Sequence, residues 1–277
     1  MTEHKLFGAS FCLLRLECRP YGRQKAAEFF SVPKRDVRIT AVTVLMFLAV
    51  TLGALVQGSV GFGFALIVVP MLALVDPDTL PATVLLLALP LSSVMVLRER
   101  RSVDFPGFLW VTGGRFLGIV GGLGLLAAVS SPYLSVMTGG LILAAVAMSL
   151  LGSSFEVGNR TRLVGGIASG VMGTAAGVGG PPLAIVYQSR PGPELRSTIA
   201  LSFAVGNAMS LLGLALVGEL EERQLRLALL LFPGLLLGLW GSRWTSKFLD
   251  ERWLRPVILA FATVSGVVAV FLGLEDR

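Results

Sequence analysis

Charged residues are scarce in this sequence. They make up 14% of its 277 residues, whereas hydrophobic residues make up 54% and the mean hydropathy is +0.80. Soluble globular chains carry roughly 25% charged residues, so too few are present here to cover a surface that faces water. The composition therefore excludes a soluble enzyme and a disordered tail protein, and it indicates a chain embedded in lipid.

Cysteine and histidine are almost absent. Cys12, Cys18 and His4, the only histidine, all lie in the N-terminal segment, without a cluster of further ligands at metal-binding spacing. This excludes a disulfide scaffold and a zinc site. No acidic residue or histidine lies inside a long apolar run, and no catalytic set is complete there. We expect no enzyme activity, no cofactor or metal, and no nucleic-acid partner.

Long uncharged, apolar runs dominate the chain. A helix of about 20 apolar residues crosses the hydrocarbon core, and only a helix satisfies its own backbone in lipid. The runs therefore predict an all-α polytopic membrane protein with about eight transmembrane helices. The predicted segments are 39–75, 80–97, 107–129, 133–152, 163–188, 197–217, 226–242 and 255–273.

The N-terminal segment differs from the remainder. Residues 1–38 hold eight basic and four acidic residues and no usable signal sequence. We predict a weakly ordered cytoplasmic extension, followed by one transmembrane domain over 39–277. With eight crossings, Lys and Arg gather on the side of the N-terminus, which the positive-inside rule places in the cytoplasm. Whether 39–75 crosses once or twice is left open.

The two halves of the transmembrane region resemble each other. When the second half is aligned to the first at an offset of 112 residues, with small shifts further along the chain, glycines, prolines and hydrogen-bonding side chains match in the same order. We predict an internal duplication with halves 39–152 and 163–274, each of four crossings, which makes the repeat parallel. The matched pairs are Gly58/Gly170, Gly61/Gly173, Pro70/Pro182, Thr83/Thr198 and Ser92/Asn207.

Glycine interrupts the first segment of each half. As a continuous helix, Ile39–Val75 would be about 55 Å long against a core of about 30 Å, so it must tilt, break or fold back. Gln57–Gly63 and Gly173–Pro182 offer places to break, and proline favours the first turn of a new helix. A helix that restarts inside the membrane presents free amide donors and a positive dipole end, which predicts an anion site.

Away from the segment ends, Arg115 is the one charged residue inside a predicted segment. A buried arginine is costly in lipid and faces a cavity, a partner or an anion; alternatively, it snorkels to the headgroups. Gly114, Gly118 and Gly122 surround it at a spacing that allows close helix packing. Asp104, at a segment end, is predicted to be a solvated cap.

The predicted substrate pathway combines the glycine breaks, Arg115 and uncharged hydrogen-bonding side chains nearby. Taken singly, each of these hydroxyl and amide groups also fits a helix–helix contact, and that alternative is left open. The pathway set is Gln57, Gly58, Ser59, Gly61, Gly63, Thr83, Ser92, Arg115, Thr174, Gly177, Gly179, Gly180, Pro181, Pro182, Thr198 and Asn207.

The glycine-rich stretch Gly177–Leu183, its looser counterpart Gly58–Met71 and the Ser/Thr-bearing helix after each resemble the TauE/SafE family of sulfite-exporter-like membrane transporters. The resemblance covers about residues 40–274. It implies a multi-pass protein of the bacterial inner membrane that moves small sulfur-containing anions such as sulfite or sulfonates. The bilayer and the anion are the expected partners, and a homo-oligomer is possible. An anion channel, a membrane-embedded enzyme and a scaffold are the alternatives.

Overall fold

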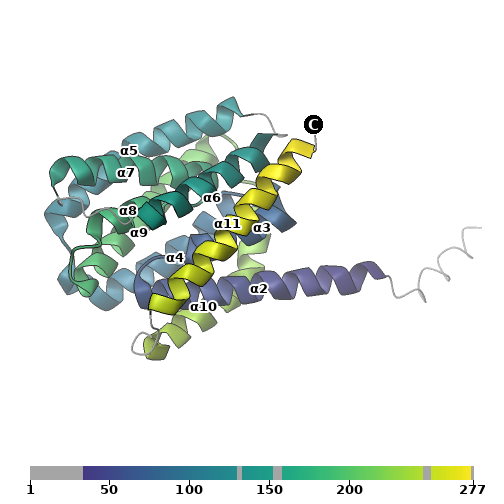
Figure 1. Cartoon of the computed structure of the whole chain (residues 1–277), viewed down its shortest axis with the longest axis horizontal. Helices are drawn as coiled ribbons and strands as arrows, with labels where there is room; N and C mark the ends of the chain where they lie inside the picture. The colour runs from purple at the N-terminus through teal and green to yellow at the C-terminus, as the bar shows by residue number, and fades with distance from the viewer. Residues whose placement is uncertain (1–33, 130–132, 152–157, 246–250, 276–277) are drawn as a thin grey trace, which may run out of the picture. The chain divides into compact units, whose positions relative to one another are not determined.

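The computed structural model describes residues 34–129, 133–151, 158–245 and 251–275, and the regular structure within them is entirely helical. Contacts divide the chain into Met1–Ala41 and Val42–Arg277. Residues 1–33, most of the predicted extension 1–38, lie outside the described residues. The α-helices, drawn in Figure 1, are α2 (Lys34–Val60), α3 (Phe64–Val75), α4 (Ala82–Glu99), α5 (Phe105–Ala128), α6 (Leu134–Leu151), α7 (Asn159–Ala176), α8 (Gly180–Tyr187), α9 (Gly192–Leu216), α10 (Glu222–Thr245) and α11 (Glu251–Glu275).

Several helices have the length and apolarity of membrane spans. Among the described residues these are α2 from Ala41 onward, α4 with the 3₁₀ turn that follows it, α5, α9 and α10. Their outward faces carry large apolar side chains, such as Leu109, Phe116 and Val120 of α5, which are more than half exposed. Such faces are stable against lipid and not against water. The chain is therefore a polytopic membrane protein.

The chain is interrupted at both predicted breaks, and at each one it reverses direction. Gly61 and Gly63 adopt φ values of 106° and 121°, and Gly177 adopts 77°, which glycine tolerates without the strain that a Cβ would add. Past the first break, Phe64 folds back against Gly53 of α2. Past the second, the hydroxyl of Ser169 donates to the carbonyl of Gly179 at 2.7 Å. Segments 39–75 and 163–188 are thus helical hairpins, and the described chain has ten helices instead of the eight that were predicted.

The helix ends correct the register of the predicted repeat. α2 ends at Val60 and α7 at Ala176, while α3 begins at Phe64 and α8 at Gly180. Gly61 therefore corresponds to Gly177, whereas the sequence comparison matched it to Gly173. The error is one helical turn. It arose because glycines recur on both sides of each break and give an ungapped match in more than one register.

The glycine ladder of α5 serves helix packing, as predicted. A Cβ at Gly114 would meet the carbonyl oxygen of Leu163 in α7, and one at Gly122 would lie 2.9 Å from the Cβ of Thr174. The two backbones are in contact, and the residue numbers of the contacting pairs increase in the same direction along both helices. α5 and α7 are therefore parallel and closely packed.

The same packing recurs between α10 and α2. A Cβ at Gly234 would lie 3.1 Å from Phe47, and one at Gly58 would lie 2.6 Å from the Cβ of Ser242. The residue numbers of the contacting pairs again increase in the same direction along both helices, so α2 and α10 are also parallel. The first half thus contributes α5 to the α5–α7 pair, and the second half contributes α10 to the equivalent pair with α2.

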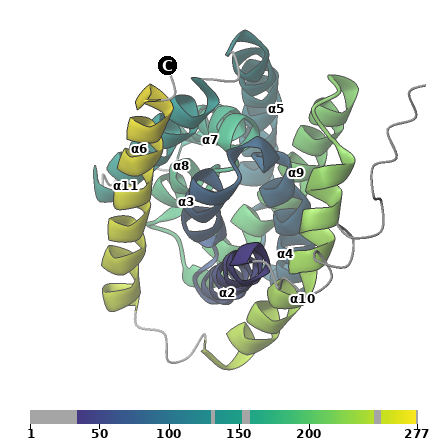
Figure 2. The ribbon, with the colours of Figure 1, turned by 90° about the vertical axis from the view of Figure 1, so that its right-hand side faces the viewer.

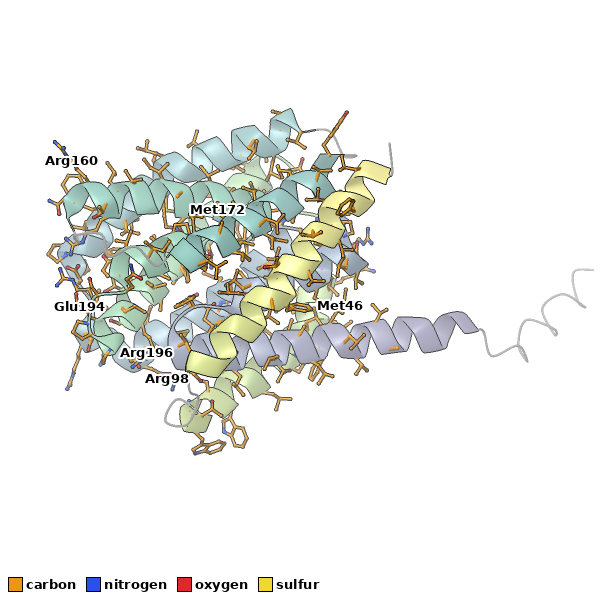
Figure 3. All side chains as sticks on the ribbon, viewed as in Figure 1. Met46, Arg98, Arg160, Met172, Glu194 and Arg196 are labelled. Atoms are coloured by element: carbon orange, nitrogen blue, oxygen red, sulfur yellow. The ribbon has the colours of Figure 1, made fainter. Side chains whose placement is uncertain are left out.

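Ion pairs identify the two ends of the bundle. Glu99, which ends α4, pairs with Arg196 of α9, and Asp104, which precedes α5, pairs with Arg162 of α7. We call this the Asp104 end; Figure 3 shows Arg98, Arg160, Glu194 and Arg196 at one end of the bundle. At the Asp76 end, Asp76 follows α3 and pairs with Arg223 in the first turn of α10. The other end of α10 lies at the Asp104 end, because Ser242 accepts a hydrogen bond from Arg98 at 3.0 Å.

Equivalent helices of the two halves consequently run in opposite directions. α4 and α10 end at the Asp104 end, whereas α9 and α5, their counterparts, begin there. The prediction of a parallel repeat is therefore wrong. It assumed four crossings in each half, but each hairpin adds a fifth helix, and an odd number of helices inverts the second copy.

The short helices of the two hairpins lie inside the bundle. α3 contacts α6 and α11, and α8 contacts α6, α7 and α9. Figure 2, which looks along the bundle, shows α3 and α8 between α6 and α11 on one side and α4 and α9 on the other. The fold therefore buries the restarting ends of both hairpins.

Candidate functional site

Residues from both glycine breaks line one cavity of about 30 Å³. Water needs roughly 10–15 Å³ on this measure, so the space holds about two or three water molecules. Half of the predicted pathway residues lie here. They are Gln57, Gly63, Arg115, Gly177, Gly179, Gly180, Pro181 and Asn207.

Arg115 reaches this cavity from α5 and is 1% exposed. Its Nη2 donates to the side-chain oxygen of Asn207 on α9 at 3.4 Å, and its Cζ lies 5.2 Å from the ring centre of Phe203. Gly206 leaves the space for the guanidinium, because a Cβ there would lie 2.5 Å from Nη2. The side chain thus points into the protein, and the snorkelling alternative does not hold.

The positive charge of Arg115 has no acidic partner among the described residues. Its Nε and Nη1 atoms are buried without a hydrogen-bond partner there, and no ion pair within that part of the chain includes it. An uncompensated buried cation costs several kcal/mol, of the order of the effective desolvation penalty of an ion. The cavity is therefore suited to an anion that approaches this guanidinium.

The first turns of α3 and α8 add backbone donors to the cavity. The first amides of a helix have no partner within it, and both helices start after a glycine without a side-chain cap. In α3 the amide of Phe64 donates to Gln57 Oε1 at 3.3 Å. The next two residues, Ala65 and Leu66, also line the cavity and carry backbone N–H groups. In α8, Pro181 and Pro182 carry no N–H. The expected amide donors are therefore more numerous in the first hairpin than in the second.

The remaining pathway residues lie outside the cavity. Thr174 shares a hydrogen bond with Ser210, Ser59 shares one with Thr245, and Thr198 accepts from the amide of Asp104. These three are contacts between helices. Outside the cavity lining are also Gly58, Gly61, Thr83, Ser92 and Pro182.

Two of these, Thr83 and Ser92, are fully buried, and their hydroxyls have no partner among the described residues. Of the pair Ser92/Asn207, only Asn207 lines the cavity, and of Thr83/Thr198, neither does. The structure therefore brings together the breaks, Arg115 and Asn207, but not the repeat-related hydroxyls.

Two features of the site escaped the sequence. Phe203 forms a wall of the cavity together with Phe64 and Leu85, and it lies one helical turn before Asn207 on the same face of α9. That spacing was a usable signal. Asp104 caps α5, as predicted, but its burial and its ion pair with Arg162 were not predicted. It accepts from the amide of Gly107 at 3.0 Å, and its side chain is 14% exposed beside Arg162.

The ten described helices form two inverted halves, and their two hairpins meet at one cavity, which is the architecture of a membrane transporter. A family model supports this class: the model of the sulfite exporter TauE/SafE family matches residues 45–269, and the chain belongs to that family. The resemblance seen at the glycine-rich stretches is confirmed. No curated protein and no solved structure matches the chain.

Proposed function

We propose that this protein carries a small anion across the bacterial inner membrane and binds it at Arg115 in the cavity between the two hairpins. The single observation that supports this most is a fully buried guanidinium whose Nε and Nη1 have no partner among the described residues. Family membership points to sulfite or a related sulfur-containing anion as the cargo.

The inverted halves suggest how the site would open alternately to each side. Glu99–Arg196 and Asp104–Arg162 join the two halves at the Asp104 end, and their side chains are only 11–30% exposed. At the Asp76 end, Arg223, with a side chain 57% exposed, makes the corresponding link. In the proposed cycle the halves rock about the cavity, so that the ion pairs of one end separate while those of the other close.

The proposed orientation places the Val42 end of α2 on the outer side, opposite to the cytoplasmic N-terminus that the sequence predicted. Among the described residues 42–245, the basic residues gather at the Asp104 end, and the positive-inside rule places that end in the cytoplasm. The prediction from the sequence counted the basic residues of 1–38. It also assigned each later connection to a side of the membrane without the extra helix that each hairpin adds. The basic residues at the Asp104 end are Arg98, Arg100, Arg101, Arg160, Arg162, Arg190, Arg196 and Arg243; those at the Asp76 end are Arg223 and Arg226.

Labelling of single cysteines in whole cells tests the orientation. In a background without Cys12 and Cys18, Arg160→Cys should be protected from a membrane-impermeant thiol reagent and Arg226→Cys should react. The opposite pattern would contradict this orientation and restore the cytoplasmic N-terminus that the sequence predicted.

Transport by purified protein in liposomes tests the function. We expect saturable uptake of radiolabelled sulfite with counterflow, and loss of more than about 90% of it in Arg115→Gln, since a charged hydrogen-bond partner contributes roughly 1.5–3 kcal/mol. The matched control is Arg226→Gln, which removes an arginine whose side chain is 75% exposed on α10. Unchanged flux in Arg115→Gln would contradict the site. Flux without saturation or counterflow indicates a channel, and chemical change of the anion indicates an enzyme.

A further inference from the structure

The cavity contains one ionisable group. Of the described residues that line it, Arg115 alone can carry charge, and Gln57 and Asn207 are the other polar side chains. Arg162 and Arg196, the nearest comparable cations of α7 and α9, are already paired with Asp104 and Glu99 at the end of the bundle. The site therefore offers a single positive charge to a ligand.

This charge balance separates ions by valence. A singly charged anion neutralises Arg115, so that the occupied cavity has no net charge. A doubly charged anion brings a second negative charge into an environment of low polarity, and the described lining has no second charged side chain to compensate for its desolvation. The apolar side chains of the lining, such as Phe64, Leu85 and Phe203, cannot hydrogen-bond a second anionic group, so only neutral donors remain for it: the side chains of Gln57 and Asn207 and the first backbone amides of α3.

The shape of the cavity adds a limit on size. About 30 Å³ holds two or three water molecules, which is comparable to one compact oxyanion of about four heavy atoms. A substrate with a carbon chain requires the walls to move apart. An ammonium group on such a chain would also find no carboxylate, because the described lining contains none.

On the basis of the proposed function, we propose that the Arg115 cavity selects a small, singly charged oxyanion, so that a diprotic substrate is carried as its monoanion. For sulfite the transported species is then hydrogensulfite. Divalent anions and amino-sulfonate zwitterions are excluded from the site. At the end of the guanidinium, Nη1, which has no partner among the described residues, and the second N–H of Nη2 form a fork that matches two oxygens of a pyramidal or trigonal oxyanion.

A pair of ions with the same shape and different charge tests the selection. Chlorate and sulfite are both pyramidal ions with three oxygens, but chlorate stays singly charged at every usable pH. Uptake of radiolabelled sulfite into proteoliposomes is measured over a pH series, with Arg115→Gln liposomes as the blank. Inhibition by chlorate at each pH controls for titration of the protein, and sulfate is the divalent competitor.

We expect the rate of sulfite uptake at subsaturating concentration to fall by about tenfold for each pH unit above the pKa of hydrogensulfite, following the monoanion. Chlorate should inhibit equally at every pH, and sulfate should inhibit at least about tenfold more weakly. A rate of sulfite uptake that does not change with pH overturns the valence selection, and so does inhibition by sulfate that is as strong as inhibition by chlorate. In either case the proposed transport function stands. If no flux exceeds the Arg115→Gln blank, the proposed function itself fails.

Discussion

Asn207→Asp is the most direct test of the charge at the site, because it changes charge with almost no change in shape. The Asn207 oxygen already accepts from Arg115 Nη2 at 3.4 Å, and a carboxylate at this position occupies the same place. Arg115 then acquires the acidic partner that the described structure does not supply. The guanidinium remains in the cavity, but its charge is compensated before any ligand arrives.

The expected size of the effect follows from Coulomb's law. A bound anion that contacts the free nitrogens of Arg115 lies roughly 5 Å from the new carboxylate, and at an effective dielectric constant of about 20 their repulsion is about 3 kcal/mol. This corresponds to a loss of about two orders of magnitude in anion affinity. The thermal stability of the purified protein should stay equal or rise, because the buried cation gains a partner.

Concentration dependence of uptake in liposomes measures this change as an increase in KM. Asn207→Ala is the neutral control: it removes a long hydrogen bond without adding charge, and its affinity loss should stay below about tenfold. A KM in Asn207→Asp that equals that of the wild type, with the protein folded, would refute the assignment of Arg115 as the anion-binding charge.

Two further predictions concern the glycines. Gly118→Leu should lower the unfolding temperature in detergent by several degrees, since a Cβ there would lie 2.9 Å from Gly170 Cα and overpacking costs roughly 1–3 kcal/mol. The control is Gly113→Leu, which has open space around it and should leave the unfolding temperature unchanged. Gly179→Val should abolish uptake while the protein still inserts, because its Cβ would lie 2.9 Å from the carbonyl oxygen of Ser169, whereas Gly180→Ala, whose nearest neighbour is at 3.8 Å, should retain most of the activity. Equal behaviour within either pair would contradict the packing on which it rests.

The sequence predicted the features that depend on a few consecutive residues. Glycine at 61, 63 and 177 marks the places where the backbone adopts positive φ, so both interruptions were readable without coordinates. Arg115 stood out because a lone charge in an apolar run must be accommodated somewhere. Membrane residence followed from the few charges, and the family followed from the glycine-rich stretches.

Features that depend on distant residues were not predictable in the same way. The hydroxyls of Thr174 and Thr198 looked equivalent to Asn207 in the sequence, yet each is bound to a side chain or amide of another helix. A hydroxyl in a helix serves packing or a cavity according to what lies opposite it, and the partner of Thr198 is 94 residues away in the chain. Sequence spacing does not contain that information.

Whether each break kinks a helix or reverses it was decided by tertiary structure alone. A glycine with positive φ permits either path, and the reversal is stabilised by long-range contacts, such as Phe64 against Gly53 and the hydrogen bond from Ser169 to Gly179. The reversal adds a helix to each half and thereby inverts the repeat. The sequence by itself thus determined that the chain lies in a membrane, breaks at glycine and buries one arginine. Only long-range packing brought the two breaks, Arg115 and Asn207 to a single cavity.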